Sequence, residues 1–164
     1  SDMNNPGLSG MKIEEAEFID AGEILSLQKI AYLDEARLYC DYEIPPLVQT
    51  LEQIRADFQT HDYLKAVIDD RIIGSVRGIQ IGDTCSIGRL IVHPEYQNRS
   101  IGTLLMSSIE AKFQAAERFE LFTGHRSQKN LHLYGKLGYR VTRTEALSSR
   151  VMLVFMEKLT TERG

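Results

Sequence analysis

The decisive stretch of this sequence is RLIVHPEYQNRSIGTLLM, from Arg89 to Met106. It predicts the end of a buried strand, a short polar turn and the first turns of an amphipathic helix. Backbone N–H groups at such a helix start point outward and bind anionic phosphate. The spacing Gln97-x-x-Ser100-x-Gly102 differs from both common nucleotide loops, G-x-x-x-x-G-K-[ST] and G-x-G-x-x-G.

A second segment, NLHLYGKLGY from Asn130 to Tyr139, follows about one strand–helix unit later. Asn130 and Tyr134 are four residues apart, so they share one face of the predicted helix. Together the two segments resemble motifs A and B of the GNAT superfamily, the acyl-CoA-dependent N-acetyltransferases. In that family motif A is Gln/Arg-x-x-Gly-x-Gly/Ala after a strand, and motif B carries Asn and Tyr on a helix that ends in Leu-Gly-Tyr/Phe.

The resemblance implies acetyl-CoA as the co-substrate, with its pyrophosphate on the loop from Gln97 to Thr103. The helix dipole and a charge-assisted contact from Arg99 would hold the phosphates. A bulge in the preceding strand would expose backbone groups, assigned to Ile91 and Val92, that polarise the thioester carbonyl and bond the pantetheine arm. The full set of co-substrate-binding residues expected is Leu90, Ile91, Val92, Gln97, Asn98, Arg99, Ser100, Ile101, Gly102, Thr103, Asn130 and Tyr134.

Ser100 departs from the family pattern, which has glycine at this position. Glycine would allow a positive φ and the closest backbone approach, whereas serine offers a hydroxyl to a helix start or a phosphate. Because Gly102 is retained, we expect at most a modest loss of CoA affinity.

Catalysis by this family requires an acid and a base. The resemblance makes Tyr134 the general acid that protonates the departing thiolate, and a phenol with a pKa of about 10 keeps its proton at neutral pH. The alternative is a structural tyrosine packed against the sheet. The strand before the loop holds no acid, so we expect His125 as the general base, with Asp41, Glu43 and Glu95 as alternatives. A surface histidine without a catalytic role is the competing interpretation.

The acceptor site of the family is lined by the first two helices and their loop, here residues 34–46. Four acids and two tyrosines in this segment favour a cationic amine, by Coulomb attraction and cation–π contact, or belong to a solvated helix face. The acceptor stays open between a polyamine-like or antibiotic amine, an amino-acid derivative, and a protein N-terminus or lysine.

Bulk properties narrow the class of protein. A chain of 164 residues fits one domain, and its net charge of −4 gives no basic footprint for nucleic acid. No apolar run approaches the ~20 residues needed to span a membrane. Cys40 and Cys85 are too few for a disulfide framework or a zinc site. We therefore expect a cytoplasmic protein without metal, nucleic acid or membrane partners, as a monomer or homodimer.

The hydrophobic pattern also predicts the order of elements. Strands are expected at 11–18, 61–68, 71–81, 85–93, 119–123, 139–145 and 150–158, and helices at 20–40, 50–58, 101–117 and 127–137. We expect residues 41–46 to end the first helix, since Pro45 and Pro46 cannot continue it, Thr50 to open a capping box and Gly138 to end the last helix. Residues 1–10 are polar and lack the features of a signal peptide, so we expect a disordered or added arm before a single domain over 11–164.

This order predicts an α+β fold in three layers, with a central twisted, mostly antiparallel sheet of about seven strands and helices on both faces. The resemblance implies the same GNAT-like fold. The expected function is transfer of an acetyl group from acetyl-CoA to a primary amine of a small molecule or protein, by direct attack in a ternary complex. The alternative is a non-catalytic CoA-binding regulatory module.

Overall fold

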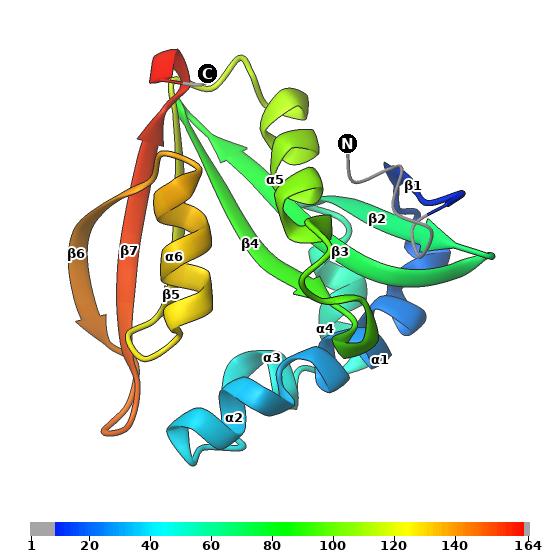
Figure 1. The fold of residues 1–164 in the computed structure, drawn as a ribbon, viewed down its shortest axis with the longest axis horizontal. Coiled ribbons are helices and arrows are strands. Elements are labelled where there is room, and N and C mark those ends of the chain that lie inside the picture. The colour runs from blue at the N-terminus through cyan, green and yellow to red at the C-terminus, as the bar shows by residue number, and fades with distance from the viewer. Residues whose placement is uncertain (1–8, 163–164) are drawn as a thin grey trace.

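The computed structural model describes residues 9–162, so most of the expected N-terminal arm lies outside the described residues. Seven strands form one sheet in the order β1-β2-β3-β4-β5-β7-β6 (Figure 1). The strands are β1 Lys12–Glu15, β2 Asp62–Ile68, β3 Arg71–Ile81, β4 Thr84–Val92, β5 Arg118–Gly124, β6 Arg140–Ala146 and β7 Met152–Leu159. Every neighbouring pair is antiparallel except β4 and β5. The α+β fold with a mostly antiparallel seven-stranded sheet is therefore confirmed.

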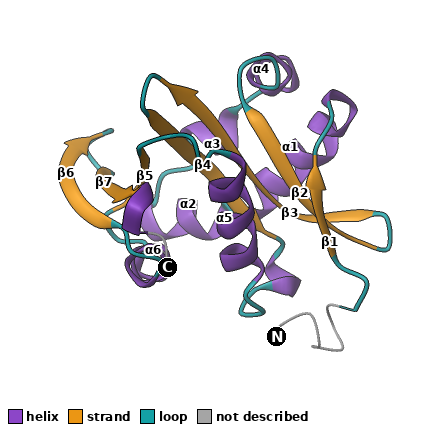
Figure 2. Cartoon of the chain, turned by 90° about the horizontal axis from the view of Figure 1, so that it is seen from above, coloured by secondary structure: helices purple, strands orange, loops and turns teal. Residues whose placement is uncertain are grey.

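Helices cover both faces of the sheet (Figure 2). They are α1 Ala21–Ala31, α2 Leu33–Tyr39, α3 Pro45–Val48, α4 Leu51–Asp57, α5 Ile101–Lys112 and α6 Gln128–Lys136, with short 3-10 turns η3 Phe18–Asp20, η4 Pro94–Tyr96 and η5 Thr160–Glu162. Successive strand residues point to opposite faces. Thus Tyr63 packs with α1 and α4, while the next residue, Leu64, packs in the core under α5.

The sheet forks between β4 and β5. These two strands pair in parallel only at their starts, the last pair joining Ser86 to Glu120. Beyond that point they diverge into a V, and α2 and α3 lie across its open end (Figure 1). The second half of β4 therefore presents unpaired backbone groups toward the opening, and an opening of this kind can receive an extended ligand as an added strand.

The first helix differs from the prediction. The pattern favours one helix over 20–40, but the chain forms the turn η3 and two helices, α1 and α2, separated at Tyr32. Tyr32 leaves the helical region with ψ near 0°, and its N–H bonds the carbonyls of Gln28 and Ile30. Helix α1 packs against Tyr63, Ile72 and Ile91 of the sheet, whereas α2 packs against Ile44 and Val151. Apolar periodicity does not register this single-residue break, because no proline or glycine marks it.

Other boundaries differ at proline and at a helix end. The preceding helix does end before the prolines, at Tyr39, but Pro45 then opens the short helix α3 at its first position, where a missing N–H is tolerated. Helix α5 ends at Lys112 instead of near 117, because the chain turns at Phe113 to enter β5. The capping box at Thr50 and the left-handed Gly138, with φ 99°, are confirmed.

Candidate active site

A bulge in β4 shapes the site at the fork of the sheet. Three steps along β4, from Gly88 to Ile91, face only two on β3, and Arg89 takes a left-handed φ of 51°. Strict alternation would place Ile87 and Ile91 on one face. Instead Ile87 packs under α5 and Ile91 packs under α1. The expected bulge is therefore present, directly before Ile91. Beyond the bulge, the side chains of β4 point to the opposite face of the sheet from the one that strict alternation would give.

A groove of about 740 Å³ runs along this opening. Its walls are the end of β4, the loop before α5, the first turn of α5, the start of α6 and the junction of α1 with α2. These elements come from three separate parts of the sequence, residues 31–38, 90–103 and 126–133, which the fork of the sheet brings together.

The start of α5 forms one end of the groove. Ser100 is the N-cap residue in a left-handed conformation, with φ 63°, and its side chain makes no capping hydrogen bond. The first turn contains no acidic residue. The N–H groups of the first turn have no partner inside the helix, so they and the helix dipole are free to bind an anion.

Most of the residues expected to bind the co-substrate do line this groove. They are Leu90, Ile91, Val92, Gln97, Asn98, Ser100, Ile101, Gly102, Thr103 and Asn130. Two residues of that set lie elsewhere. The guanidinium of Arg99 lies 5.5 Å from the ring centre of Tyr96, outside the groove lining, and Tyr134 lines a neighbouring cavity.

That second cavity measures about 260 Å³ and adjoins the groove. Four residues line both spaces: Tyr32, Glu35, Leu90 and Asn130. Two ligands bound in the two spaces would therefore meet at this junction.

Tyr134 of α6 lies in the wall of the second cavity and is 6% exposed. Burial raises its pKa, and the neighbouring Tyr32 and Glu35 add to that rise. In the part of the chain that the structure describes, its hydroxyl has no hydrogen-bond partner. Tyr134 therefore presents a protonated, uncommitted phenol to the cavity.

The residues expected as general base lie away from both cavities. His125 is exposed; its Nδ1 accepts a 3.0 Å hydrogen bond from the N–H of Met152, and its ring packs 5.5 Å from Tyr39. Asp41, Glu43 and Glu95 line neither space. Glu35 is instead the carboxylate that borders both, where it accepts a hydrogen bond from the Ser127 hydroxyl.

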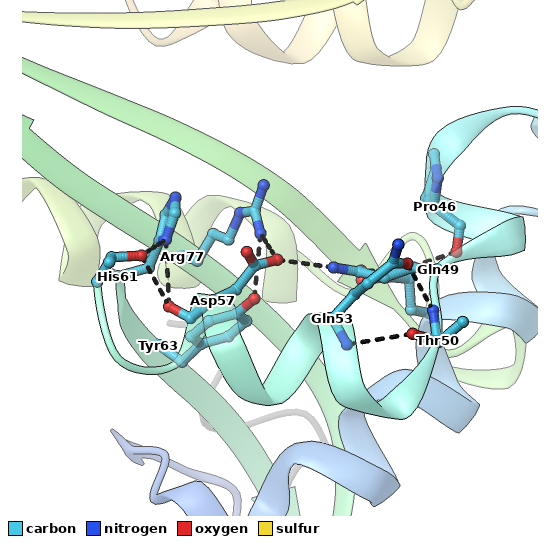
Figure 3. A network of polar contacts seen from close by, with 10 residues as sticks. Pro46, Gln49, Thr50, Gln53, Asp57, His61, Tyr63 and Arg77 are labelled. Carbon is cyan, nitrogen blue, oxygen red and sulfur yellow. Dashed lines mark hydrogen bonds and ion pairs between the residues drawn. The ribbon is translucent and has the colours of Figure 1, made fainter.

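A polar network holds Arg77, one of the residues that line the second cavity (Figure 3). Arg77 donates to the Asp57 carboxylate at 2.7 Å and to the Tyr63 hydroxyl at 3.2 Å. Asp57 also accepts from the Gln49 amide at 2.7 Å. His61 lies beside this network, and its pKa is lowered first by burial and then by the charge of Arg77. The network fixes the Arg77 guanidinium with its charge matched by Asp57.

The sequence did not identify five residues of this region: Tyr32, Glu35, His61, Arg77 and Arg89. Glu35 belongs to the segment predicted to line the acceptor site, but nothing in the pattern distinguishes it from its acidic neighbours. Arg77 and Arg89 reach the cavity because of the bulge register between β3 and β4, which hydrophobic alternation does not encode. Two arginines also make the cavity less acidic than residues 34–46 suggested.

Within residues 9–162, no group of three or more His, Cys, Asp or Glu side chains is placed to hold a metal ion. In the same range, no helix is long and apolar enough to cross a membrane.

Residues 26–139 match the sequence model of the Acetyltransferase (GNAT) family. Among curated proteins, UPF0157 protein YqkA from Bacillus subtilis (strain 168) is 25% identical over 142 residues, which are 86% of this chain and 40% of that protein. The chain therefore spans less than half the length of this relative.

Solved structures share the fold at low sequence identity. An acetyltransferase of the GNAT family from Streptococcus pneumoniae superposes with a TM-score of 0.71 at 21% identity, over 91% of this chain and 98% of that one. The ribosomal-protein-S18-alanine N-acetyltransferase from Escherichia coli gives 0.76 at 12%, over 94% and 96%. PaiA N-acetyltransferase from Thermoplasma acidophilum, in complex with coenzyme A, gives 0.66 at 18%, over 92% and 99%. The expected fold and the family resemblance are confirmed.

Proposed function

The chain belongs to the GNAT acetyltransferase family, and from this premise we propose that it moves an acetyl group from acetyl-CoA to a primary amine by direct attack in a ternary complex. One observation carries the proposal. A long groove and a small cavity meet at a junction bordered by Tyr32, Glu35, Leu90 and Asn130. Direct transfer requires both substrates to be bound at the same time in adjoining spaces, which this arrangement provides. No covalent enzyme intermediate then has to be formed.

The groove fits a CoA-type co-substrate. The uncapped start of α5 supplies N–H groups and a positive helix end for a pyrophosphate. The edge of β4 beyond Ser86 is unpaired toward β5, so Leu90 to Val92 can bond an amide-containing arm as an added strand. A family neighbour holds coenzyme A on the same fold. Acetyl-CoA, rather than another acyl-CoA, is part of the proposal.

The proposed reaction needs two proton transfers, one to the departing sulfur and one from the attacking amine. The amine nitrogen forms a bond to the acetyl carbon, and the carbon–sulfur bond breaks. Tyr134 donates its proton to the departing sulfur, and Glu35 accepts the proton that the amine loses, directly or through a water molecule. A backbone N–H of the bulged segment of β4 polarises the carbonyl.

The rival function is a CoA-binding regulatory module without turnover. It was suggested by Ser100 and by the lack of an acid on β4. The cavity beside the groove favours the enzyme, since a binding module has no need for a second space that holds an uncommitted phenol and a carboxylate. Cytoplasmic location and the monomeric or dimeric state stay predictions.

Steady-state release of free CoA from acetyl-CoA in the presence of amines tests the proposal. Tyr134→Phe should lower kcat by roughly 10²-fold, because general acid catalysis contributes 10²–10⁴-fold, with CoA affinity little changed. Tyr42→Phe is the matched control, since Tyr42 is exposed and lines neither space. An unaltered kcat in Tyr134→Phe would remove the acid role. Binding of acetyl-CoA without turnover of any amine would favour the regulatory module.

A further inference from the structure

Resting on the proposed function, we propose that the acceptor is a small zwitterionic amino acid with an apolar side chain, its carboxylate held by Arg89 and its ammonium by Glu35. The inference follows from the charges, size and walls of the cavity beside the groove.

Arg89 is the unmatched cation of this cavity. In the described part of the chain no carboxylate lies within ion-pairing distance of its guanidinium, and its Nε is buried without a hydrogen-bond partner. An unpaired buried donor is costly, and a charged one more so. Its backbone is also held in a left-handed conformation, a form of strain that concentrates at functional sites. A bound carboxylate would supply the missing acceptor, because a guanidinium presents several N–H groups in one plane.

Arg77 does not play the same part. Its charge is matched by Asp57 at 2.7 Å, and the network around it fixes its position (Figure 3). It therefore needs no anion from a ligand. The unmatched charge of Arg89 in so small a space disfavours a polyamine, whose several positive charges it would repel.

Glu35 supplies the opposite charge where the cavity adjoins the groove. It forms no ion pair within residues 9–162, and it borders both the cavity and the groove. An ammonium held there would lie at the junction, where the amine must meet the acetyl group. One unmatched cation and one unmatched anion thus line the same small cavity, as recognition of the two ends of a zwitterion requires.

The remaining walls indicate the size and polarity of the acceptor. A volume of about 260 Å³ is smaller than the ~300–1,000 Å³ typical of drug-sized ligands, so the acceptor is small. Apolar side chains supply much of the lining, among them Ile44, Ile79, Phe122, Leu147 and Leu153. They would bury an apolar side chain such as that of leucine.

The experiment compares three probes that differ only in the group facing Arg89: L-leucine, L-leucinamide and isopentylamine. CoA release with acetyl-CoA gives kcat/KM for each. We expect L-leucine to exceed the other two by roughly 100-fold or more, because a site built for a polar group rejects an analogue that lacks it. Calorimetric titration of L-leucine into the CoA-loaded protein measures recognition without turnover.

Arg89→Met removes the charge at similar length and keeps a side chain at the left-handed position. It should reduce the preference for L-leucine to a few-fold and abolish its calorimetric signal, with acetyl-CoA affinity unchanged and a thermal midpoint no lower than that of the wild type, because the variant removes an unpaired buried donor. Arg55→Met is the control, since Arg55 is exposed and lines neither space. Arg89→Lys should retain part of the preference, because the charge remains without the planar fork.

Equal turnover of L-leucine and isopentylamine would overturn this inference while leaving the acetyltransferase proposal intact. Equal turnover of L-leucine and the dipeptide leucyl-alanine would also overturn it, in favour of a peptide N-terminus. Binding of L-leucine that depends on Arg89 but leads to no CoA release would support the recognition and refute the enzyme. Absence of both binding and preference would overturn the inference.

Discussion

The hydroxyl of Tyr39 occupies the space beside Gly124 that the β-carbon of any other residue would fill. From this position it accepts a 2.8 Å hydrogen bond from the N–H of Arg126 and bonds the Ser127 hydroxyl at 2.9 Å. Ser127 in turn donates to Glu35. A glycine at the end of β5 thus lets a buried tyrosine of α2 connect the fork of the sheet to the carboxylate at the junction of the two cavities.

Gly124→Ala should disturb both the fold and the site. The new methyl group meets the Tyr39 hydroxyl and ring, so the tyrosine must shift and lose its hydrogen bonds; overpacking of this kind costs about 1–3 kcal/mol. We expect that loss in urea unfolding, together with a lower kcat/KM as Glu35 loses its fixed partner. Gly135→Ala is the control: nothing lies within 4 Å of its β-carbon, and alanine in a helix should stabilise by about 0.8–1.0 kcal/mol.

A double variant sharpens this prediction. Tyr39→Phe removes the hydroxyl that the alanine methyl would meet first, so it should recover part of the stability lost in Gly124→Ala. Strictly additive losses in the double variant would show that the two residues do not interact in the way the structure indicates.

Ser100→Gly should stabilise the protein slightly. Ser100 is left-handed, at φ 63°, and makes no capping bond, so glycine relieves a conformation that costs an L-residue about 1–2 kcal/mol. Glycine also gives the unfolded chain greater conformational freedom, which lowers the free energy of unfolding by about 0.4–1 kcal/mol and offsets part of this gain. Ser107→Gly in the exposed middle of the same helix has no strain to relieve and should destabilise. Thermal unfolding of both variants gives the comparison, and a loss in Ser100→Gly as large as in Ser107→Gly would contradict it.

Gly102→Glu should abolish binding of acetyl-CoA without unfolding the protein. Its β-carbon would lie 3.6 Å from Leu133 and 3.8 Å from Leu90, which are ordinary contacts, and Gly102 lines the groove. The carboxylate would therefore enter the space proposed for the pyrophosphate and repel it. Ser107→Glu adds the same charge to an exposed position of α5 and should leave calorimetric affinity unchanged. Retained affinity in Gly102→Glu would mean that the phosphates bind elsewhere.

The strands and the start of α5 could be predicted because local sequence patterns encode them. Alternation gave the strands, and the polar turn after Val92 predicted the start of α5 at Ile101, as observed. The break at Tyr32 was missed, because it depends on tertiary contacts at the junction of two helices rather than on a proline or glycine. Helix α3 was missed because prolines stop a helix only in its interior, whereas Pro45 begins one.

The site was predictable in one half only. Ten of the residues that line the groove belong to two contiguous motifs, so the sequence located them, whereas the walls from the junction of α1 with α2 and from the start of α6 lie outside those motifs. The second cavity depends on the bulge at Arg89, on the fork after Ser86 and on Tyr39 from α2, three features that act over long sequence distances. A single sequence without this register could not show that Arg77 and Arg89 line the second cavity.

His61 should make stability depend on pH between neutral and mildly acidic conditions. Burial and the charge of Arg77 lower its pKa in the folded protein, against a smaller opposing effect of its hydrogen bond to the Asp57 carbonyl. The folded state therefore binds fewer protons than the unfolded chain once the pH falls through about 6.5, the ordinary histidine value. The stability associated with neutral His61 is present above that pH and is lost as the pH falls toward the lowered pKa.

Urea unfolding at pH 7.5 and pH 5.5 measures this contribution. The wild-type protein should lose more free energy of unfolding between the two pH values than His61→Gln, which has no proton to bind at this position. All other ionisable residues are the same in both proteins, so the comparison isolates the contribution of His61. His132→Gln on α6, where His132 lines the groove instead of packing beside Arg77, is the histidine control and should keep the wild-type dependence. If the stability of His61→Gln and of the wild type depended equally on pH, the prediction that His61 causes this dependence would be wrong.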